Sequence, residues 1–117
     1  MKVIIAGSRS ITNFAVIDQA IKASGFEITE VVSGTDRGVD RLGELWALRN
    51  RVRVRRFPAD WGEYGSAAGM IRNREMAEHA QALVLVWDGE SVGSRSMLSI
   101  ARELGLKVHV VTVEVEG

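Results

Sequence analysis

Short apolar runs along the chain alternate with longer segments in which apolar residues recur at three- and four-residue spacing. The runs at residues 2–6, 29–33 and 82–87 are typical of strands covered on both faces, because such strands lose the alternation of a half-exposed strand. The run at 82–87 is apolar throughout, which makes it the best candidate for a central strand. Residues 107–113 are predicted to form the last strand.

The segment from Val52 to Phe57 has a different pattern, in which Val52 and Val54 alternate with Arg53 and Arg55. Such alternation predicts a third strand that is exposed on one side. Charged side chains on a strand discourage pairing with a second sheet, so we expect this strand at an edge.

Four segments between the strands carry apolar residues on one helical face. The first begins at a cap formed by Thr12 or Asn13 and ends at Gly25, a residue type that commonly terminates helices. The other three are predicted from about residue 39 to Asn50, from about residue 68 to Gln81, and from the segment after Ser94 to Gly105. The side chains expected to face the core are Phe14, Ile17, Ala20 and Ile21 in the first helix, Val39, Leu42, Leu45 and Trp46 in the second, and Met97, Leu98, Ala101 and Leu104 in the fourth.

Strands that alternate with amphipathic helices predict an α/β fold with a mainly parallel sheet covered on both faces. We expect a single Rossmann-like three-layer domain over residues 1–113, built from a five-stranded sheet and four helices. The sheet order is predicted as 3-2-1-4-5, since the third strand belongs at an edge. Residues 59–67 are expected to form a polar loop, and residues 114–117 a frayed tail.

Composition narrows the classes of protein that remain. The chain of 117 residues suits one domain, and it contains no cysteine, which excludes disulfides, thiolate catalysis and Cys-ligated metal sites. Its 15 basic and 15 acidic residues cancel, which argues against a nucleic-acid partner in spite of the five arginines between residues 49 and 56. The apolar runs are too short for a membrane span or a signal peptide, so we expect a cytoplasmic protein.

Glycine and small polar residues gather where the first four strands end. The segments are GSR at 7–9, SGTDRG at 33–38, PADW at 58–61 and WDGESVGS at 87–94. Because the carboxyl ends of parallel strands lie at one edge of a sheet, these loops predict a ligand site there.

Two of these loops open a helix directly after a strand. The amides and the positive dipole at a helix start favour an anion, commonly phosphate, which predicts anion binding at residues 34–38 and at Gly93 and Ser94. The alternative for the first loop is an ordinary strand-to-helix turn capped by Thr35 or Asp36.

Further candidates lie in the third loop and the third helix. Arg72 and Arg74 diverge by about 160° on a regular helix, so at most one points into the site. Trp61 or Tyr64 is suited to stack on a base and Asp60 to bind a ribose hydroxyl, with simple packing of the loop as the alternative. The candidate ligand-binding residues are Gly7, Ser8, Arg9, Gly34, Thr35, Arg37, Gly38, Asp60, Trp61, Arg72, Arg74, Gly89, Glu90, Gly93 and Ser94.

Several common chemistries lack support. The loops carry neither GxGxxG nor GxxxxGK[ST], the motifs of dinucleotide and P-loop ATP binding. His79 and His109 lack the spacing of a zinc site or the context of a catalytic triad. We therefore predict no cofactor, no metal and no catalytic residue.

Five segments together resemble the YspA-like branch of the SLOG superfamily: GSR at 7–9, SGTDRGVDRLGELWA at 33–47, FPADW at 57–61, AAGMIRNREMAE at 67–78 and WDGESVGSRSM at 87–97. That superfamily includes the LOG (Lonely Guy) cytokinin-activating phosphoribohydrolases, DprA-type proteins and sensors of nucleotide-derived signals. The resemblance covers nearly the whole chain. It implies a Rossmann-like fold that binds a nucleotide or a nucleotide derivative, with phosphate-binding roles for Gly34, Arg37, Gly38, Gly93 and Ser94.

The chain departs from the hydrolytic members of that superfamily at one position. In LOG enzymes a helix arginine and a glutamate in a PGGxGTxxE loop carry hydrolysis of the N-glycosidic bond. Arg72 matches the arginine, whereas the loop here is two residues longer and places Met97 at the glutamate position and Ser96 at the acidic position before it. Methionine neither stabilises an oxocarbenium-like centre nor activates water. Glu90, Asp88 and Asp60 are the loop carboxylates that could substitute.

We therefore expect a nucleotide-ligand-binding protein, either a sensor or a sequestering module. Its partner is a small nucleotide or nucleotide derivative, without a membrane partner. The leading alternative is LOG-like hydrolysis of nucleoside monophosphates, and the second is DprA-like nucleic-acid binding. The sequence leaves the oligomeric state open, with a homodimer as one option.

Overall fold

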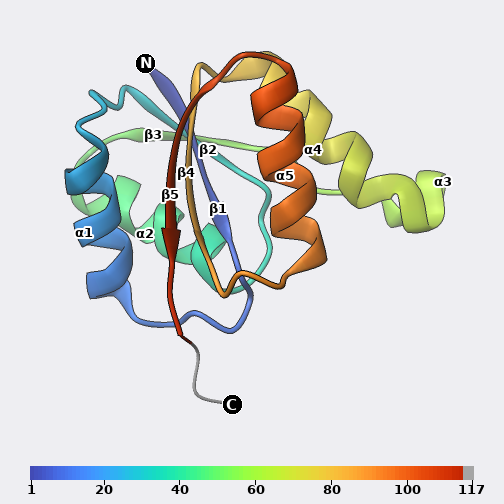
Figure 1. Ribbon diagram of the computed structural model, residues 1–117. Helices are drawn as coiled ribbons and strands as arrows, with labels where there is room; N and C mark the ends of the chain where they lie inside the picture. The colour runs from blue at the N-terminus through green and yellow to red at the C-terminus, as the bar shows by residue number, and fades with distance from the viewer. Residues whose placement is uncertain (115–117) are drawn as a thin grey trace.

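A computed structural model of the protein describes residues 1–114. It contains five strands, which are β1 (Lys2–Gly7), β2 (Glu30–Ser33), β3 (Arg53–Arg56), β4 (Ala82–Trp87) and β5 (Lys107–Thr112). The strands form one sheet in the order β3-β2-β1-β4-β5, and every neighbouring pair is parallel (Figure 1). The predicted α/β class and strand order are confirmed.

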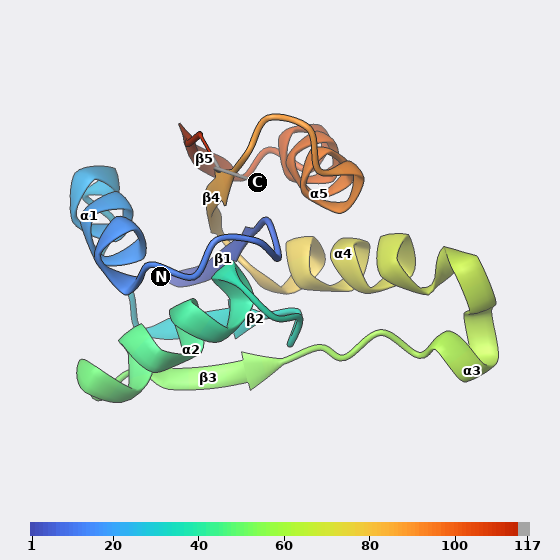
Figure 2. The same cartoon turned by 90° about the horizontal axis from the view of Figure 1, so that it is seen from below.

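Four long helices connect the strands, and Figure 2 shows two of them on each face of the sheet. They are α1 (Phe14–Ser24) and α2 (Val39–Arg49) on one face, and α4 (Ala68–His79) and α5 (Val92–Glu103) on the other. Asn13 caps α1 with its side chain, and Gly25 ends it in a left-handed conformation. The predicted frayed tail falls mostly on residues 115–117, which lie outside the described part of the chain.

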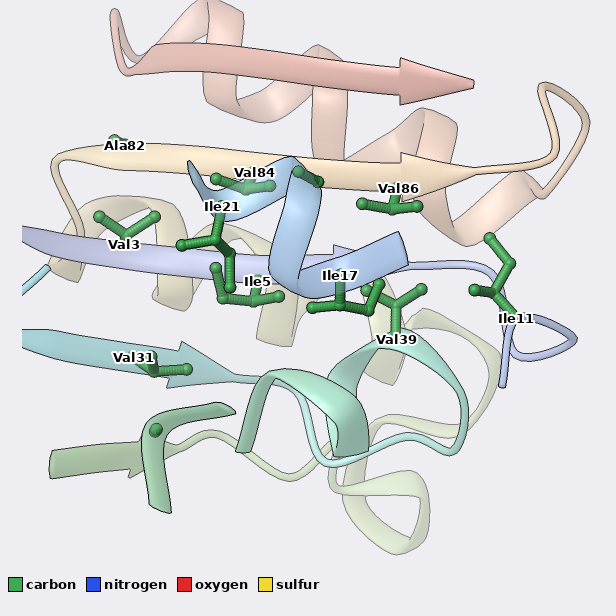
Figure 3. Packing of buried hydrophobic residues seen from close by; sticks show 12 residues of the cluster. Val3, Ile5, Ile11, Ile17, Ile21, Val31, Val39, Ala82, Val84 and Val86 are labelled. Carbon is green, nitrogen blue, oxygen red and sulfur yellow. The ribbon is translucent and has the colours of Figure 1, made fainter. Parts of the chain in front are cut away.

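Apolar side chains fill both spaces between the sheet and the helices. Val3 and Ile5 of β1 and Val84 of β4 lie in one cluster with Ile17 and Ile21 of α1, all of them buried (Figure 3). Alternate strand positions belong to a second cluster beneath α4 and α5. Because it contributes to both clusters, β4 is buried along its whole length, as its apolar sequence predicts for an inner strand.

The second helix packs more closely than its apolar pattern predicts. A Cβ atom at Gly43 would lie only 2.7 Å from the Cβ atom of Ile5, so glycine lets α2 approach β1. Leu42 and Trp46, predicted to face the core, are partly buried against it, and Leu45 is half-buried.

The segment 59–67 is not the predicted loop. It forms the short helix α3 (Trp61–Tyr64) and a 3-10 turn at Gly65–Ala67, at the end of α4 that points away from the sheet (Figure 2). The carboxylate of Asp60 starts α3 by accepting the amide N–H of Glu63 at 3.0 Å.

The end of the last helix also differs from the prediction. Leu104 was expected to face the core but is 39% exposed. The helix α5 ends at Glu103, and Gly105 turns the chain with a φ of 76°, which leaves the Leu104 side chain outside the core.

Candidate ligand-binding site

A cavity of about 640 Å³ lies at the carboxyl ends of β1 and β4. These two strands are neighbours at the point where the order of the sheet reverses, which is where open α/β sheets bind ligands. The loops after β1 and β4, the starts of α2 and α5, and one side of α4 form the walls of the cavity.

Ser8, which is only 2% exposed, joins three of these segments. Its hydroxyl accepts the amide N–H of Asp88 at 3.0 Å, and its carbonyl accepts the amide N–H of Val39 at 3.3 Å. The loop before α2 comes so close that a Cβ atom at Gly38 would lie 2.4 Å from the carbonyl oxygen of Ser8. With its φ of 77°, residue 38 therefore needs glycine for two reasons.

The loop at residues 34–38 has the backbone of a helix start, but two of its amides already have partners inside the protein. The amide of Thr35 donates to the Ser33 hydroxyl, and the amide of Asp36 donates to Oδ2 of Asp40, each at 3.1 Å. This loop therefore positions its neighbours. The predicted ligand-binding residues of the loop that lie outside the cavity wall are Gly34, Thr35, Arg37 and Gly38.

Arg72 of α4 holds the loop in place from within the cavity wall. It is 8% exposed, and its guanidinium donates to the carbonyl of Gly34 and contacts the Asp36 carboxylate at 3.4 Å. A Cβ atom at Gly34 would lie 2.8 Å from both the Arg72 guanidinium and Oδ2 of Asp40, so a larger residue there would force these side chains to shift.

Asn73 extends this contact to the opposite wall. Its side-chain oxygen accepts a hydrogen bond from Nε of Arg72 at 3.0 Å, and its side-chain nitrogen donates to the carbonyl of Gly93 at 3.4 Å. A continuous polar chain therefore runs from the loop after β2, through α4, to the first turn of α5.

The first turn of α5 carries a buried polar group without a hydrogen-bond partner among the described residues. Ser91 caps the helix by accepting the amide N–H of Ser94 at 3.4 Å. Ser94 itself is 4% exposed and lines the cavity, and its hydroxyl has no hydrogen-bond partner among the described residues. A buried hydroxyl without a partner is costly, so this group is suited to a bound ligand.

Asp88 shapes the loop that leads into this helix. Its carboxylate accepts the amide N–H groups of Glu90 and Ser91, each at 2.9 Å. These hydrogen bonds, the one from Glu90 first, lower the pKa of Asp88 below its usual range. Asp88 is therefore a structural carboxylate of the cavity rim.

Asp40 is the other carboxyl group whose ionisation the fold changes. It lies in the first turn of α2, lines the cavity and is 5% exposed. Burial raises the pKa of Asp40 from 3.8 to about 7, and the like charge of Asp36 adds to the rise. The amide of Asp36 and the positive charge of Arg72 oppose it without cancelling it.

Trp61 stands at the mouth of the cavity. It is 53% exposed and lines the opening, where its ring lies over Gly69 at the start of α4. Tyr64 is also exposed, but it does not line the cavity. Of the two aromatic candidates, the structure brings only Trp61 to the site.

The structure gathers about half of the predicted ligand-binding residues around the cavity. Those that line it are Gly7, Ser8, Arg9, Trp61, Arg72, Gly93 and Ser94. Besides the four residues of the second loop, those that do not line it are Asp60, Arg74, Gly89 and Glu90. Arg74 points to a smaller groove between α4 and α5 and pairs with Glu103 at 3.0 Å, as the divergence of the two helix arginines predicts.

Asp40, Asn73 and Ser91 line the cavity although the sequence did not single them out. An aspartate in the first turn of a helix is common, so nothing in the sequence marks Asp40 as a residue of the site. Asn73 follows Arg72, and on a regular helix the next residue points away by about 100°. Among the described residues no cluster of side chains could hold a metal ion, and no helix has the length and apolarity to cross a membrane.

A family model described as the YspA, cpYpsA-related SLOG family matches residues 1–64, more than half of the chain. The chain belongs to this family. The matched part of this SLOG domain contains β1, the loop after β2 and α2, and so includes Ser8, Gly34 and Asp40.

Two known proteins resemble this SLOG domain over longer stretches. It is 34% identical over 84 residues to the Gene 61 protein of Mycobacterium phage D29, a match that covers 67% of each chain. The X-ray structure of DNA processing protein A (DprA) from Streptococcus pneumoniae is similar over 97% of the chain, with a TM-score of 0.77 and 19% identity. The chain spans about half of that protein's length, 51%, and the likeness shows the fold alone.

Proposed function

We propose that this SLOG-family protein binds a nucleotide or a nucleotide-derived ligand in the cavity at the carboxyl ends of β1 and β4, as a sensor or a sequestering module. Family membership supports a ligand of this class. The observation that carries the proposal is the buried Ser94 hydroxyl, which has no partner among the described residues and lies at the start of α5 inside the cavity.

The start of α5 is the best place for a phosphate group. Backbone N–H groups in the first turn of a helix lack partners within the helix, and the helix dipole favours negative charge there. The Ser94 hydroxyl adds a donor that is already buried, so a phosphate oxygen would satisfy it. Asn73 holds this turn in position through the carbonyl of Gly93.

Arg72 and Arg9 supply positive charge to the same cavity. Arg72 uses three of its N–H donors on Gly34, Asp36 and Asn73, and a guanidinium has five. Arg9 is largely exposed at the rim and lies 3.8 Å from the Asp36 carboxylate. One buried and one exposed arginine suit an anion that enters from solvent.

The remaining walls fit the other parts of a nucleotide. Trp61 offers an exposed ring at the mouth, where a base could stack. Met97 is 1% exposed and lines the cavity at the position where hydrolytic relatives carry glutamate. An apolar thioether there supports binding of the ligand without cleavage.

Calorimetric titration with AMP, ADP-ribose and cyclic ADP-ribose isomers tests this proposal. We expect at least one of them to bind, and Ser94→Ala to weaken that binding about tenfold, on the scale of a hydrogen bond to a charged group. Ser99→Ala is the matched control, because Ser99 is an exposed serine of the same helix. Equal effects of both substitutions would contradict the placement of the phosphate.

The nucleic-acid alternative gives a different result in the same experiment. Binding of a single-stranded oligonucleotide that weakens steeply with salt, without binding of any nucleotide, would favour it. The titration therefore includes an oligonucleotide at two salt concentrations.

A further inference from the structure

Asp40 places a buried carboxyl group in the wall of the cavity in which we propose that an anion binds, and Asp36 and Asp88 also line this cavity. Its side chain is 5% exposed and lines the cavity, and its Oδ2 accepts the amide N–H of Asp36 at 3.1 Å. A negative charge at this position would repel an anionic ligand in a site where water screens poorly. The protonation state of Asp40 therefore matters for binding.

The groups that face Asp40 come from three segments. Asp36 in the loop after β2 and Glu44 on α2 repel its negative charge, and the α2 helix start favours that charge. Arg72 on α4 is the cation that faces it, but the Arg72 guanidinium is held by Gly34 and Asp36. Within residues 1–114 no cation forms an ion pair with Asp40.

These contacts leave the two protonation states of Asp40 close in free energy near neutral pH. Burial is the main reason, and it brings the pKa of the group to about 7. An anion bound at the start of α5 and near Arg72 would disfavour the charged form further. The neutral form would then be the one present in the complex.

We propose that the cavity binds its anionic ligand together with one proton, and that Asp40 is the group that holds this proton. The inference rests on the proposed function, since it needs an anion in the cavity. It makes the affinity of the site depend on pH: ligand binding weakens as the pH rises above neutrality, and each bound ligand takes up a proton when Asp40 starts ionised.

ADP-ribose is the probe for the test, because each of its two phosphates carries a substituent on both sides and does not titrate near neutrality. AMP is less suitable, because its phosphate loses a second proton at a pH of about 6. Titrations at pH 6, 7, 8 and 8.5 are expected to show wild-type affinity falling about tenfold between pH 6 and pH 8. Asp40→Asn is expected to lose this dependence.

A control variant and the response of Asp40→Asn itself show whether Asp40 is the group that takes up the proton. Asp18→Asn makes the same change on α1, where Asp18 pairs with Lys22 at 2.9 Å, and it should keep the wild-type pH dependence. His79 and His109 are both present in Asp40→Asn, so a pH dependence that this variant retains would come from another group and would overturn the proposal.

A second measurement needs no variant. Titrations of the wild type in two buffers with different ionisation enthalpies, at pH 7.5, should show uptake of between half a proton and one proton per ligand bound. Binding of ADP-ribose with no pH dependence and no proton uptake would overturn this proposal and leave the proposed function intact. Absence of binding by AMP, ADP-ribose and the cyclic isomers at every pH would overturn the proposed function itself, and this proposal with it.

Discussion

The guanidinium of Arg72 donates a hydrogen bond to the carbonyl oxygen of Gly34, which joins α4 to the loop after β2 at the edge of the cavity. The two residues are 38 positions apart, and both are buried. A Cβ atom at residue 34 would lie 2.8 Å from the guanidinium and from Asp40, so these two side chains would have to shift to admit it. Glycine here serves close packing around an arginine.

Gly34→Ala should therefore destabilise the protein by about 1–3 kcal/mol, the usual cost of forcing an extra carbon atom into a packed site. Urea unfolding measures this change. Gly93→Ala is the control, because a Cβ atom at Gly93 would meet nothing within 4 Å. If both variants unfold at the wild-type urea concentration, the packing around residue 34 is looser than the structure indicates.

Arg72→Ala should weaken binding of the nucleotide by about 1.5–3 kcal/mol, on the scale of hydrogen bonds to a charged group. Arg53→Ala should leave binding nearly unchanged, because Arg53 is exposed on the edge strand β3. The resemblance to the family implies a phosphate contact for Arg37. Arg37 is exposed and lies outside the cavity, however, so we expect Arg37→Ala also to leave binding nearly unchanged. Calorimetric titration measures all three, with unfolding curves to separate binding from stability.

The free energy of unfolding of Asp40→Asn, taken relative to that of the wild type, should be larger at pH 8 than at pH 5. The folded state raises the pKa of Asp40 from 3.8 to about 7, so the folded protein binds more protons than the unfolded chain between these values. The wild type therefore loses stability from this group as the pH rises through that range, whereas asparagine does not titrate. The advantage of the variant should grow by up to about 3 kcal/mol between pH 5 and pH 8.

Urea unfolding at the two pH values checks this sign. Asp18→Asn, at a half-buried position of α1 that pairs with Lys22, should show no such growth. A stability difference between Asp40→Asn and wild type that is the same at pH 5 and pH 8 would mean that Asp40 has an ordinary pKa.

Release of base from AMP should be undetectable or very slow in the wild type, because Met97 presents no carboxylate to the cavity. Met97→Glu should restore at most a trace, since the longer loop before α5 misplaces the sugar and a shift of about 1 Å can cost a hundredfold in rate. Chromatography of the incubated samples measures both. Robust turnover by the wild type would favour the hydrolase alternative, and Glu90→Ala and Asp40→Asn would then identify the carboxylate.

The fold was open to prediction because its signals are local and strong. The apolar run of β4 and the alternating arginines of β3 each correspond to the position that the strand takes in the sheet. The sequence pattern did not predict the helix α3, because that helix is short. Asp60 caps a helix of one turn at α3, and a segment of that length carries no apolar periodicity.

The location of the site could be predicted from the sequence, but only some of the residues that form it could. The glycine-rich loops located the edge of the sheet, but a pattern of residue types does not say whether a backbone amide is free. The amides of Thr35 and Asp36 donate to Ser33 and Asp40, and this pairing depends on tertiary structure. The burial that raises the pKa of Asp40 is likewise a property of the assembled cavity.

The contact between Ser8 and Asp88 links residues 80 positions apart in the chain. The cavity consequently does not exist until β4 has paired with β1 and the loop after it has reached Ser8. A nascent chain that has left the ribosome only as far as β3 contains most of the segment that marks the family, yet it lacks α5 and the Ser94 hydroxyl. Ligand binding as we propose it would therefore come late in synthesis, and a bound ligand would stabilise only chains that have completed the sheet.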